Sequence, residues 1–187
     1  MLNDTRRRTE GAAFFALFVL TIPLANWMVG NVGTVCVPNG PCLVPVAPHL
    51  TAPSGVLMIG IALVLRDLVQ RRLGAGVAAS AILLGAALSA AVAPPSLVLA
   101  SAAAFLVSEF ADLAVYTPLQ RRRFVAAVVA SSVVGLVVDS VVFLYLAFGS
   151  LEFLAGQVVG KAWMIALAVP VVAWLRRRDA RLGLAPA

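Results

Sequence analysis

Six ionisable residues lie within apolar stretches of the chain, and their presence there needs a chemical explanation. They are Arg66, Asp67, Glu109, Asp112, Asp139 and Lys161. A charged side chain at the centre of a membrane helix costs about 2.5 to 3.5 kcal/mol on insertion scales, so such residues pair with one another or face a polar cavity. Two of the six are cations and four are carboxylates. Surplus carboxylates favour a ligand that donates hydrogen bonds. A guanine-type base, with its ring N–H beside an NH₂ group, is compatible with this, and so are many cationic or amide-bearing metabolites.

Helical spacing predicts that these groups share faces with other polar or aromatic side chains. The predicted sets are Glu109 with Asp112 and Tyr116, Gln157 with Lys161, and Gly135 with Asp139 and Phe143. Residues three or four apart lie on the same face of a helix. Asn26 adds an amide in the first apolar stretch. We therefore expect four helices to direct polar groups into one chamber near the middle of the membrane.

Purely structural roles are the alternative for several of these residues. Arg66 can form a structural ion pair with Glu109 or Asp112, which would remove the cost of an isolated charge in the membrane. Asp67 can pair with Arg71, one turn further along the same predicted helix. Each of these pairs would hold helices together without any contact to a ligand.

The same alternative applies to residues nearer the expected centre of the chamber. Lys161 and Asp139 can form one buried ion pair that only fixes the packing of two helices. Phe143 can be a packing residue, or it can be a platform on which a planar base stacks. The sequence leaves both choices open.

The composition is that of an integral membrane protein. Hydrophobic residues make up 62% of the 187 residues and charged residues only 12%, whereas soluble domains average about 25% charged residues. The mean hydropathy is +1.02. A chain of this length has room for about six spanning helices, at roughly 20 residues each, and little else. We expect an all-α, polytopic membrane protein with a single transmembrane domain over residues 1–187.

Six apolar stretches of spanning length are separated by polar, proline-rich or glycine-rich segments. The predicted spans are 11–31, 54–73, 75–93, 95–116, 124–148 and 151–175, with a long outer loop at 32–53. The first stretch is too long for a signal peptide and lacks a small-residue cleavage pattern. We therefore count it as a span.

The basic residues predict the orientation of the spans. Twelve of the 14 lie in 6–8, 71–72, 121–123 and 176–181, which fall on one side of the membrane if six helices alternate. The positive-inside rule then places both termini in the cytoplasm, and we expect a multi-pass protein of the bacterial plasma (inner) membrane. Because topology accounts for the net charge of +6, we do not expect a nucleic-acid partner. The expected surroundings are the lipid bilayer.

The predicted outer loop carries the two cysteines of the chain, Cys36 and Cys42, in the stretch "CVPNGPC". The intervening Pro-Asn-Gly-Pro favours a turn that brings them together, and an oxidising compartment favours a disulfide. A zinc site would need further ligands, and His49 is the single histidine available. We expect a disulfide, no metal site, and a loop that folds back over the helices.

Several stretches together resemble the queuosine precursor transporter family, also called the VUT family, of bacterial inner-membrane proteins. They are "TAPSGVLMIGIALVLRDLVQRRLG" (51–74), "SEFADLAVYTPLQRR" (108–122), "SSVVGLVVDSVVFLYLAFG" (131–149) and "VVGKAWMIALAVP", which carries Lys161. Asn26 in the first span completes the pattern. The chain departs from the family in two places, at Arg66 and in the Cys36 and Cys42 pair.

This resemblance implies six helices similar to the substrate-binding subunits of energy-coupling-factor vitamin transporters. It also implies uptake of a 7-deazapurine base: 7-cyano-7-deazaguanine, 7-aminomethyl-7-deazaguanine or queuine. The implied substrate-binding residues are Asn26, Glu109, Asp139 and Lys161, and with less weight Asp67 and Asp112. Our expected mechanism is alternating access, in which Asp139 or Glu109 binds the N–H edge of the base. Lys161 or Gln157 would bind its carbonyl edge.

Enzyme activity is not expected from this sequence. No glycine-rich nucleotide-binding loop is present, and neither a serine nucleophile motif nor a pair of histidines points to hydrolysis. We expect no catalytic residue and no cofactor. Two alternatives stay open: a vitamin-type binding subunit that needs a separate energising module, and a purely structural or homo-oligomeric membrane subunit. Ala12 and Ala16 offer a small-residue face for docking to such a partner.

Overall fold

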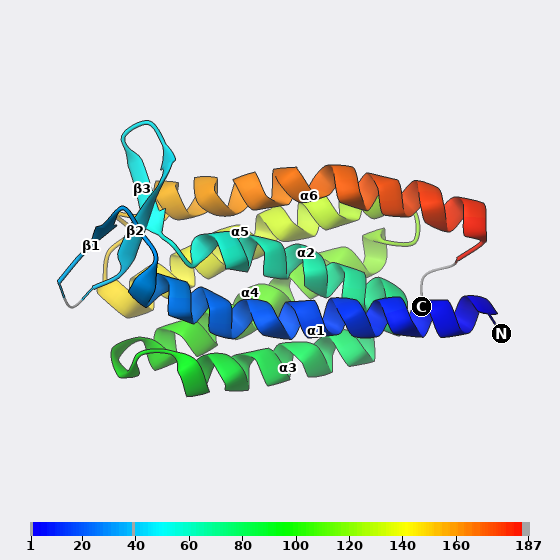
Figure 1. The fold of residues 1–187 in the computed structure, drawn as a ribbon, viewed down its shortest axis with the longest axis horizontal. Helices are drawn as coiled ribbons and strands as arrows, with labels where there is room; N and C mark the ends of the chain where they lie inside the picture. The colour runs from blue at the N-terminus through cyan, green and yellow to red at the C-terminus, as the bar shows by residue number, and fades with distance from the viewer. Residues whose placement is uncertain (1, 39, 185–187) are drawn as a thin grey trace.

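The computed structural model describes residues 2–38 and 40–184. Its elements are α1 (Leu2–Asn31), β1 (Val35–Cys36), β2 (Cys42–Ala47), β3 (Leu50–Pro53), α2 (Val56–Leu73), α3 (Ala75–Val92), the 3₁₀ turn η1 (Pro95–Leu97), α4 (Val98–Leu119), α5 (Phe124–Phe148) and α6 (Leu154–Leu182). The helices lie side by side along the long axis, with the strands at one end (Figure 1). The sequence predicted an all-α, multi-pass membrane protein, and the structure is mostly helical, with a small sheet in addition.

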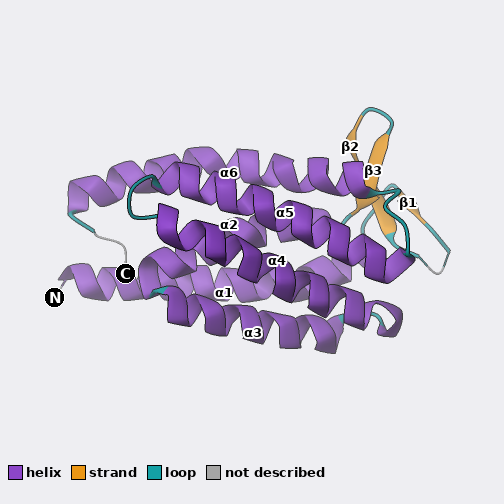
Figure 2. Cartoon of the chain, turned by 180° about the vertical axis from the view of Figure 1, so that it is seen from behind, coloured by secondary structure: helices purple, strands orange, loops and turns teal. Residues whose placement is uncertain are grey.

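Five of the described helices, all except α2, are long and apolar enough to cross a membrane. Helix α2 carries Arg66, Asp67, Arg71 and Arg72 within its 18 residues, and all four are buried. It contacts α1, α3, α5 and α6, and from behind it lies behind α4 and α5 (Figure 2). Because α2 is the central helix, its charges face other helices instead of lipid. That α2 is a sixth span stays a prediction.

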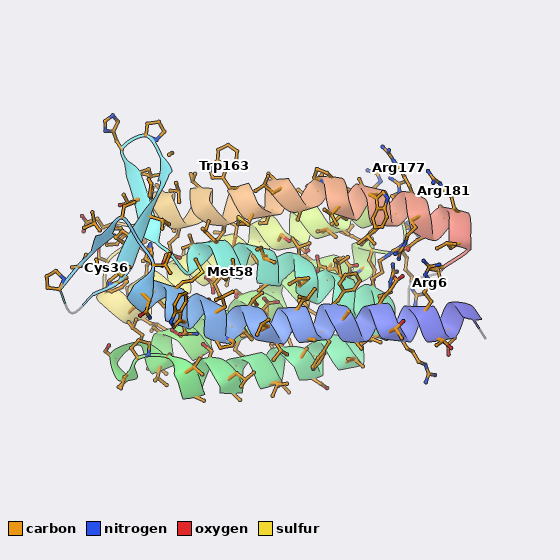
Figure 3. The ribbon with its side chains drawn as sticks, in the orientation of Figure 1. Arg6, Cys36, Met58, Trp163, Arg177 and Arg181 are labelled. Atoms are coloured by element: carbon orange, nitrogen blue, oxygen red, sulfur yellow. A yellow bond between two sulfur atoms is a disulfide. The ribbon has the colours of Figure 1, made fainter. Side chains whose placement is uncertain are left out.

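The helices extend beyond the apolar stretches at the end opposite the strands. Helix α1 begins at Leu2 instead of 11, and α6 continues to Leu182 instead of ending at 175. The first turns of α1 carry ion pairs within the helix, such as Arg6 with Glu10 at 3.3 Å, which suit a helix that leaves the apolar layer. Arg6, Arg177 and Arg181 lie at this end and Cys36 lies at the other (Figure 3). Which of the two ends faces the cytoplasm stays a prediction.

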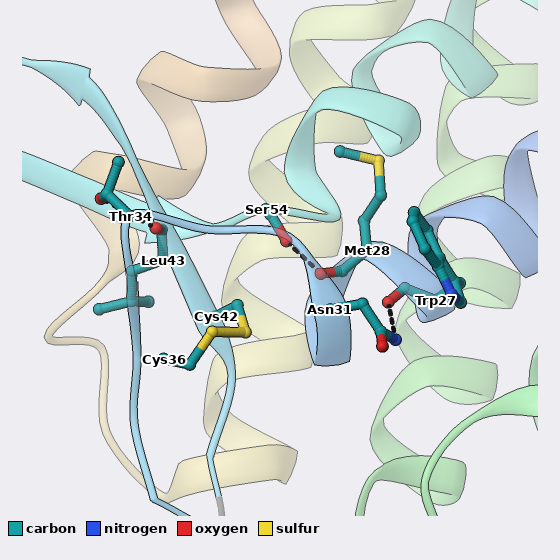
Figure 4. Close-up of a disulfide and its surroundings, with 8 residues drawn as sticks. All are labelled: Trp27, Met28, Asn31, Thr34, Cys36, Cys42, Leu43 and Ser54. Atoms are coloured by element: carbon teal, nitrogen blue, oxygen red, sulfur yellow. Dashed lines mark hydrogen bonds between the residues drawn. A yellow bond between two sulfur atoms is a disulfide. The ribbon is translucent and has the colours of Figure 1, made fainter.

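The segment predicted as an outer loop, 32–53, contains a small antiparallel sheet in the order β1-β2-β3. Cys36 is the pairing partner of Cys42 in the sheet, and a disulfide joins the two side chains. The sheet is fixed to the helices by two hydrogen bonds: Trp163 Nε1 donates to the Val46 carbonyl at 3.0 Å, and Ser54 Oγ donates to the Met28 carbonyl at 2.7 Å (Figure 4). The segment therefore folds back on the helix ends.

Glycines allow α2 and α6 to approach each other closely. A Cβ at Gly60 would lie 2.8 Å from the Lys161 carbonyl oxygen, and one at Gly160 would lie 2.7 Å from Val56 Cγ2. Separations this short are not tolerated without displacement of a neighbour, and the atom facing Gly60 belongs to the backbone. The position of Lys161 relative to α2 is thus fixed by direct contact between the two helices.

Candidate binding cavity

A cavity of about 70 Å³ lies in the half of the bundle nearer the strands. All six α-helices contribute to its wall, together with Pro53 at the end of β3 and Leu97 of η1. Its polar side chains are Asn26, Ser89, Ser101, Asp139, Gln157 and Lys161. One buried water needs roughly 10 to 15 Å³ by this kind of measure, so the cavity has room for several waters.

Lys161 is the centre of the polar wall. Its Nζ donates to Asp139 Oδ2 at 2.6 Å, to Ser140 Oγ at 2.8 Å and to Gln157 Oε1 at 2.8 Å. An ammonium group has three N–H donors, so Lys161 is saturated by protein acceptors. It pairs with one carboxylate, and the formal charge of the pair is zero. The pair joins α5 to α6.

Three polar side chains of this wall keep unused hydrogen-bonding capacity. Within the described residues, no hydrogen bond engages the second carboxylate oxygen of Asp139 or the Nε2 amide of Gln157. Asn26 donates from Nδ2 to the Ile22 carbonyl at 3.0 Å, which leaves its side-chain oxygen as an acceptor. The cavity therefore offers acceptors and a donor between apolar walls that include Phe105 and Phe143. Such a mixture of apolar walls and a few polar groups is typical of small-molecule sites.

Four other predicted site residues form a separate cluster. Arg66 contacts Asp67 Oδ1 at 2.7 Å through Nη1 and Glu109 Oε2 at 3.0 Å through Nε, and its Nη2 contacts Asp112. Ser131 Oγ on α5 donates to Asp67 Oδ2 at 2.9 Å. All of these side chains are buried, and none of them lines the cavity. We call Arg66, Asp67, Glu109 and Asp112 the Arg66 cluster.

From the sequence we expect one chamber for all the polar groups, whereas the structure divides them into two sets. The reason is depth along the helices. Phe105 of α4 and Ile59 of α2 line the cavity. Glu109 lies one turn beyond Phe105 along α4, and Arg66 lies two turns beyond Ile59 along α2. At about 1.5 Å per residue these steps amount to roughly 6 and 10 Å. The Arg66 side chain is long enough for its guanidinium group to contact all three carboxylates.

A third buried group, at the end opposite the strands, was missed by the sequence analysis. Arg72 contacts Asp179 Oδ1 at 2.7 Å and Glu10 Oε2 at 3.0 Å, and Arg71 contacts Asp179 Oδ2 at 3.1 Å. The alternative pairing of Arg71 with Asp67 is therefore wrong, because Asp179 takes Arg71 and Arg66 takes Asp67. These contacts tie α1, α2 and α6 together. The available signal was that Glu10 and Asp179 are acidic residues beside arginine runs.

Residues 91–175 match the model of a protein family described as "Putative vitamin uptake transporter". The matched stretch is less than half of the chain, and it contains Glu109, Asp112, Asp139, Gln157 and Lys161 but no part of α1 or α2. No curated protein and no solved structure matches the chain. The resemblance to this transporter family is confirmed over these residues.

Proposed function

We propose that this chain is a membrane transporter that takes up 7-deazaguanine precursors of queuosine through the cavity beside Lys161. The match to a vitamin uptake transporter family supports transport of a small molecule instead of catalysis. The choice of 7-deazaguanines, among them 7-cyano-7-deazaguanine, 7-aminomethyl-7-deazaguanine and queuine, rests on the sequence resemblance and on the chemistry of the cavity.

The observation that carries the proposal is the unused hydrogen-bonding capacity on either side of Lys161. A guanine-type base presents a ring N–H beside an exocyclic NH₂, and both can donate to the free oxygen of Asp139. Its carbonyl needs a donor, which the Gln157 amide supplies. The ion pair with Lys161 offsets the cost of burying the Asp139 carboxylate within a span.

The residues fall into two roles under this proposal. Asn26, Asp139 and Gln157 bind the polar edges of the base, and Phe143 packs on its face. Lys161 positions Asp139 and Gln157 through its own hydrogen bonds. The Arg66 cluster supports the helices behind the site and makes no contact with the base. The cavity lies nearer the strands, so the base enters from that end. The contact of Arg72 with Glu10, which joins α2 to α1, closes the opposite end until the helices rearrange.

An uptake experiment tests the function directly. Cells that cannot make queuosine should accumulate labelled 7-deazaguanine when they express this chain and should not when they lack it. Equal uptake with and without well-expressed protein would refute transport of these bases.

Thermal unfolding of the purified protein separates the candidate substrates. We expect 7-deazaguanines to raise the unfolding temperature and riboflavin and thiamine to leave it unchanged. Stabilisation by a vitamin alone would favour the second candidate, a vitamin-type binding subunit, which the family description supports. Such a subunit would need an energising module, and Ala12 and Ala16 lie exposed on α1 where a partner helix could dock.

A further inference from the structure

A second hollow lies at the end of the bundle where the arginines gather. It has a volume of about 450 Å³ and opens at the surface between the start of α5 and the last third of α6. Its lining residues are Arg122, Arg123, Val125, Ala126, Val129 and Arg176. We call it the basic groove. It shares no lining residue with the cavity beside Lys161.

The three arginines of the basic groove have no carboxylate partner among residues 2–38 and 40–184. The acidic residues at this end are already engaged: Glu10 and Asp179 by Arg72, and Asp4 by Arg7. Arg122, Arg123 and Arg176 are exposed. Guanidinium groups bind phosphate oxygens through planar, charge-assisted hydrogen bonds, so the charge of the groove matches a phosphate.

The wall between the arginines is apolar and continues along α5. Val125, Ala126 and Val129 form it, and further along α5 the side chains of Val133 and Val137 are 47% and 43% exposed. Residues four apart lie on one face of a helix, so a strip of exposed apolar side chains leads from the basic groove into the membrane layer. A free inorganic anion would gain nothing from this strip.

We propose that the basic groove binds an anionic phospholipid, whose phosphate lies among the three guanidinium groups and whose acyl chain follows α5. Basic pockets between membrane helices have this combination of charge and apolar surface. Trp174 on α6, 57% exposed beside Arg178, is an aromatic residue of the kind that lies at the headgroup level. The proposal does not depend on which substrate is transported.

The test compares the unfolding temperature of the full chain in phosphatidylcholine, with and without phosphatidylglycerol. We expect phosphatidylglycerol to raise it, and inorganic phosphate added to phosphatidylcholine alone to have no such effect. The variant Arg122→Gln/Arg123→Gln/Arg176→Gln should lose most of that increase. The matched control is Arg121→Gln/Arg177→Gln/Arg181→Gln, which removes the same charge at the same end outside the groove and should keep the increase.

A second variant separates the groove from its charge. Ala126→Trp retains all three arginines and fills the groove with an indole, and it should also lose most of the increase while unfolding normally in phosphatidylcholine. If the groove variant and the control variant lose the same part of the increase in unfolding temperature, the effect is a general attraction between charges. An equal increase with inorganic phosphate would show a site for a soluble anion. Either result, or full retention of the increase by Ala126→Trp, would overturn the proposal.

Discussion

Lys161 and Arg66 are both buried cations inside the helix bundle, but their surroundings differ in two ways. Lys161 pairs with one carboxylate on the wall of a cavity, whereas Arg66 contacts three carboxylates in a region that the cavity does not reach. Beside Lys161, an oxygen of Asp139 and the amide of Gln157 are left for a ligand. A charge within a span therefore indicates a binding site when its neighbours have unused hydrogen-bonding groups that face open space.

The largest expected effect comes from Arg66→Gln. The substitution leaves three carboxylates buried without their cation, and removal of one partner from a buried ion pair costs about 3 to 5 kcal/mol. We expect a large drop in the unfolding temperature and in the yield of folded protein. If the variant folds normally but no longer binds 7-deazaguanine, Arg66 instead belongs to the binding site.

Asp139→Asn should act mainly on binding. The amide keeps the size of the side chain but removes the charge and one acceptor, and a hydrogen bond to a charged group contributes about 1.5 to 3 kcal/mol. We expect binding of 7-deazaguanine to weaken by about 10- to 100-fold, with a smaller loss of stability than in Arg66→Gln. Calorimetric titration measures the affinity. Intact binding with reduced stability would show that the Lys161 pair only fixes helix packing.

The smallest effect is expected from Glu109→Gln, which probes a residue that the family resemblance places in the binding site. Glutamine retains an acceptor for Arg66 Nε, which lies 3.0 Å from Glu109, so the loss of stability should be about 1 kcal/mol, as for a single hydrogen bond. Affinity for 7-deazaguanine should stay within about twofold of the wild type, a difference of roughly 0.4 kcal/mol. A loss of affinity as large as that of Asp139→Asn would place Glu109 in the site.

Composition and helical spacing were enough to predict the class of fold and part of the candidate site. The low charge content indicated a membrane protein, and spacing brought Gln157 to the side of Lys161 and Phe143 to the side of Asp139, all of which line the cavity. Spacing fixes which side chains share a helix face, but it does not fix the height of one helix against the next. The step of about one turn between Glu109 and the cavity wall therefore does not follow from spacing alone.

Two other features depended on contacts that a single sequence does not reveal. The strands within 35–53 are short and contain prolines, so their alternation is too weak to distinguish a sheet from a loop. The pairing of Asp179 with Arg71 and Arg72 joins residues more than 100 positions apart. Local rules, such as the pairing of residues one turn apart on a helix, favour a partner nearer in the sequence. For Arg71 they favoured Asp67.

The close contact at Gly60 and Gly160 restricts how this protein can move. A backbone that touches its neighbour has no gap into which it can slide, so α2 and α6 are expected to travel together as one rigid half of the molecule. Lys161 follows Gly160 directly, and its side chain would be carried with that half. The gate that admits or releases a solute is then formed by the remaining helices, and their shift would change the distance between Lys161 and Asp139 of α5.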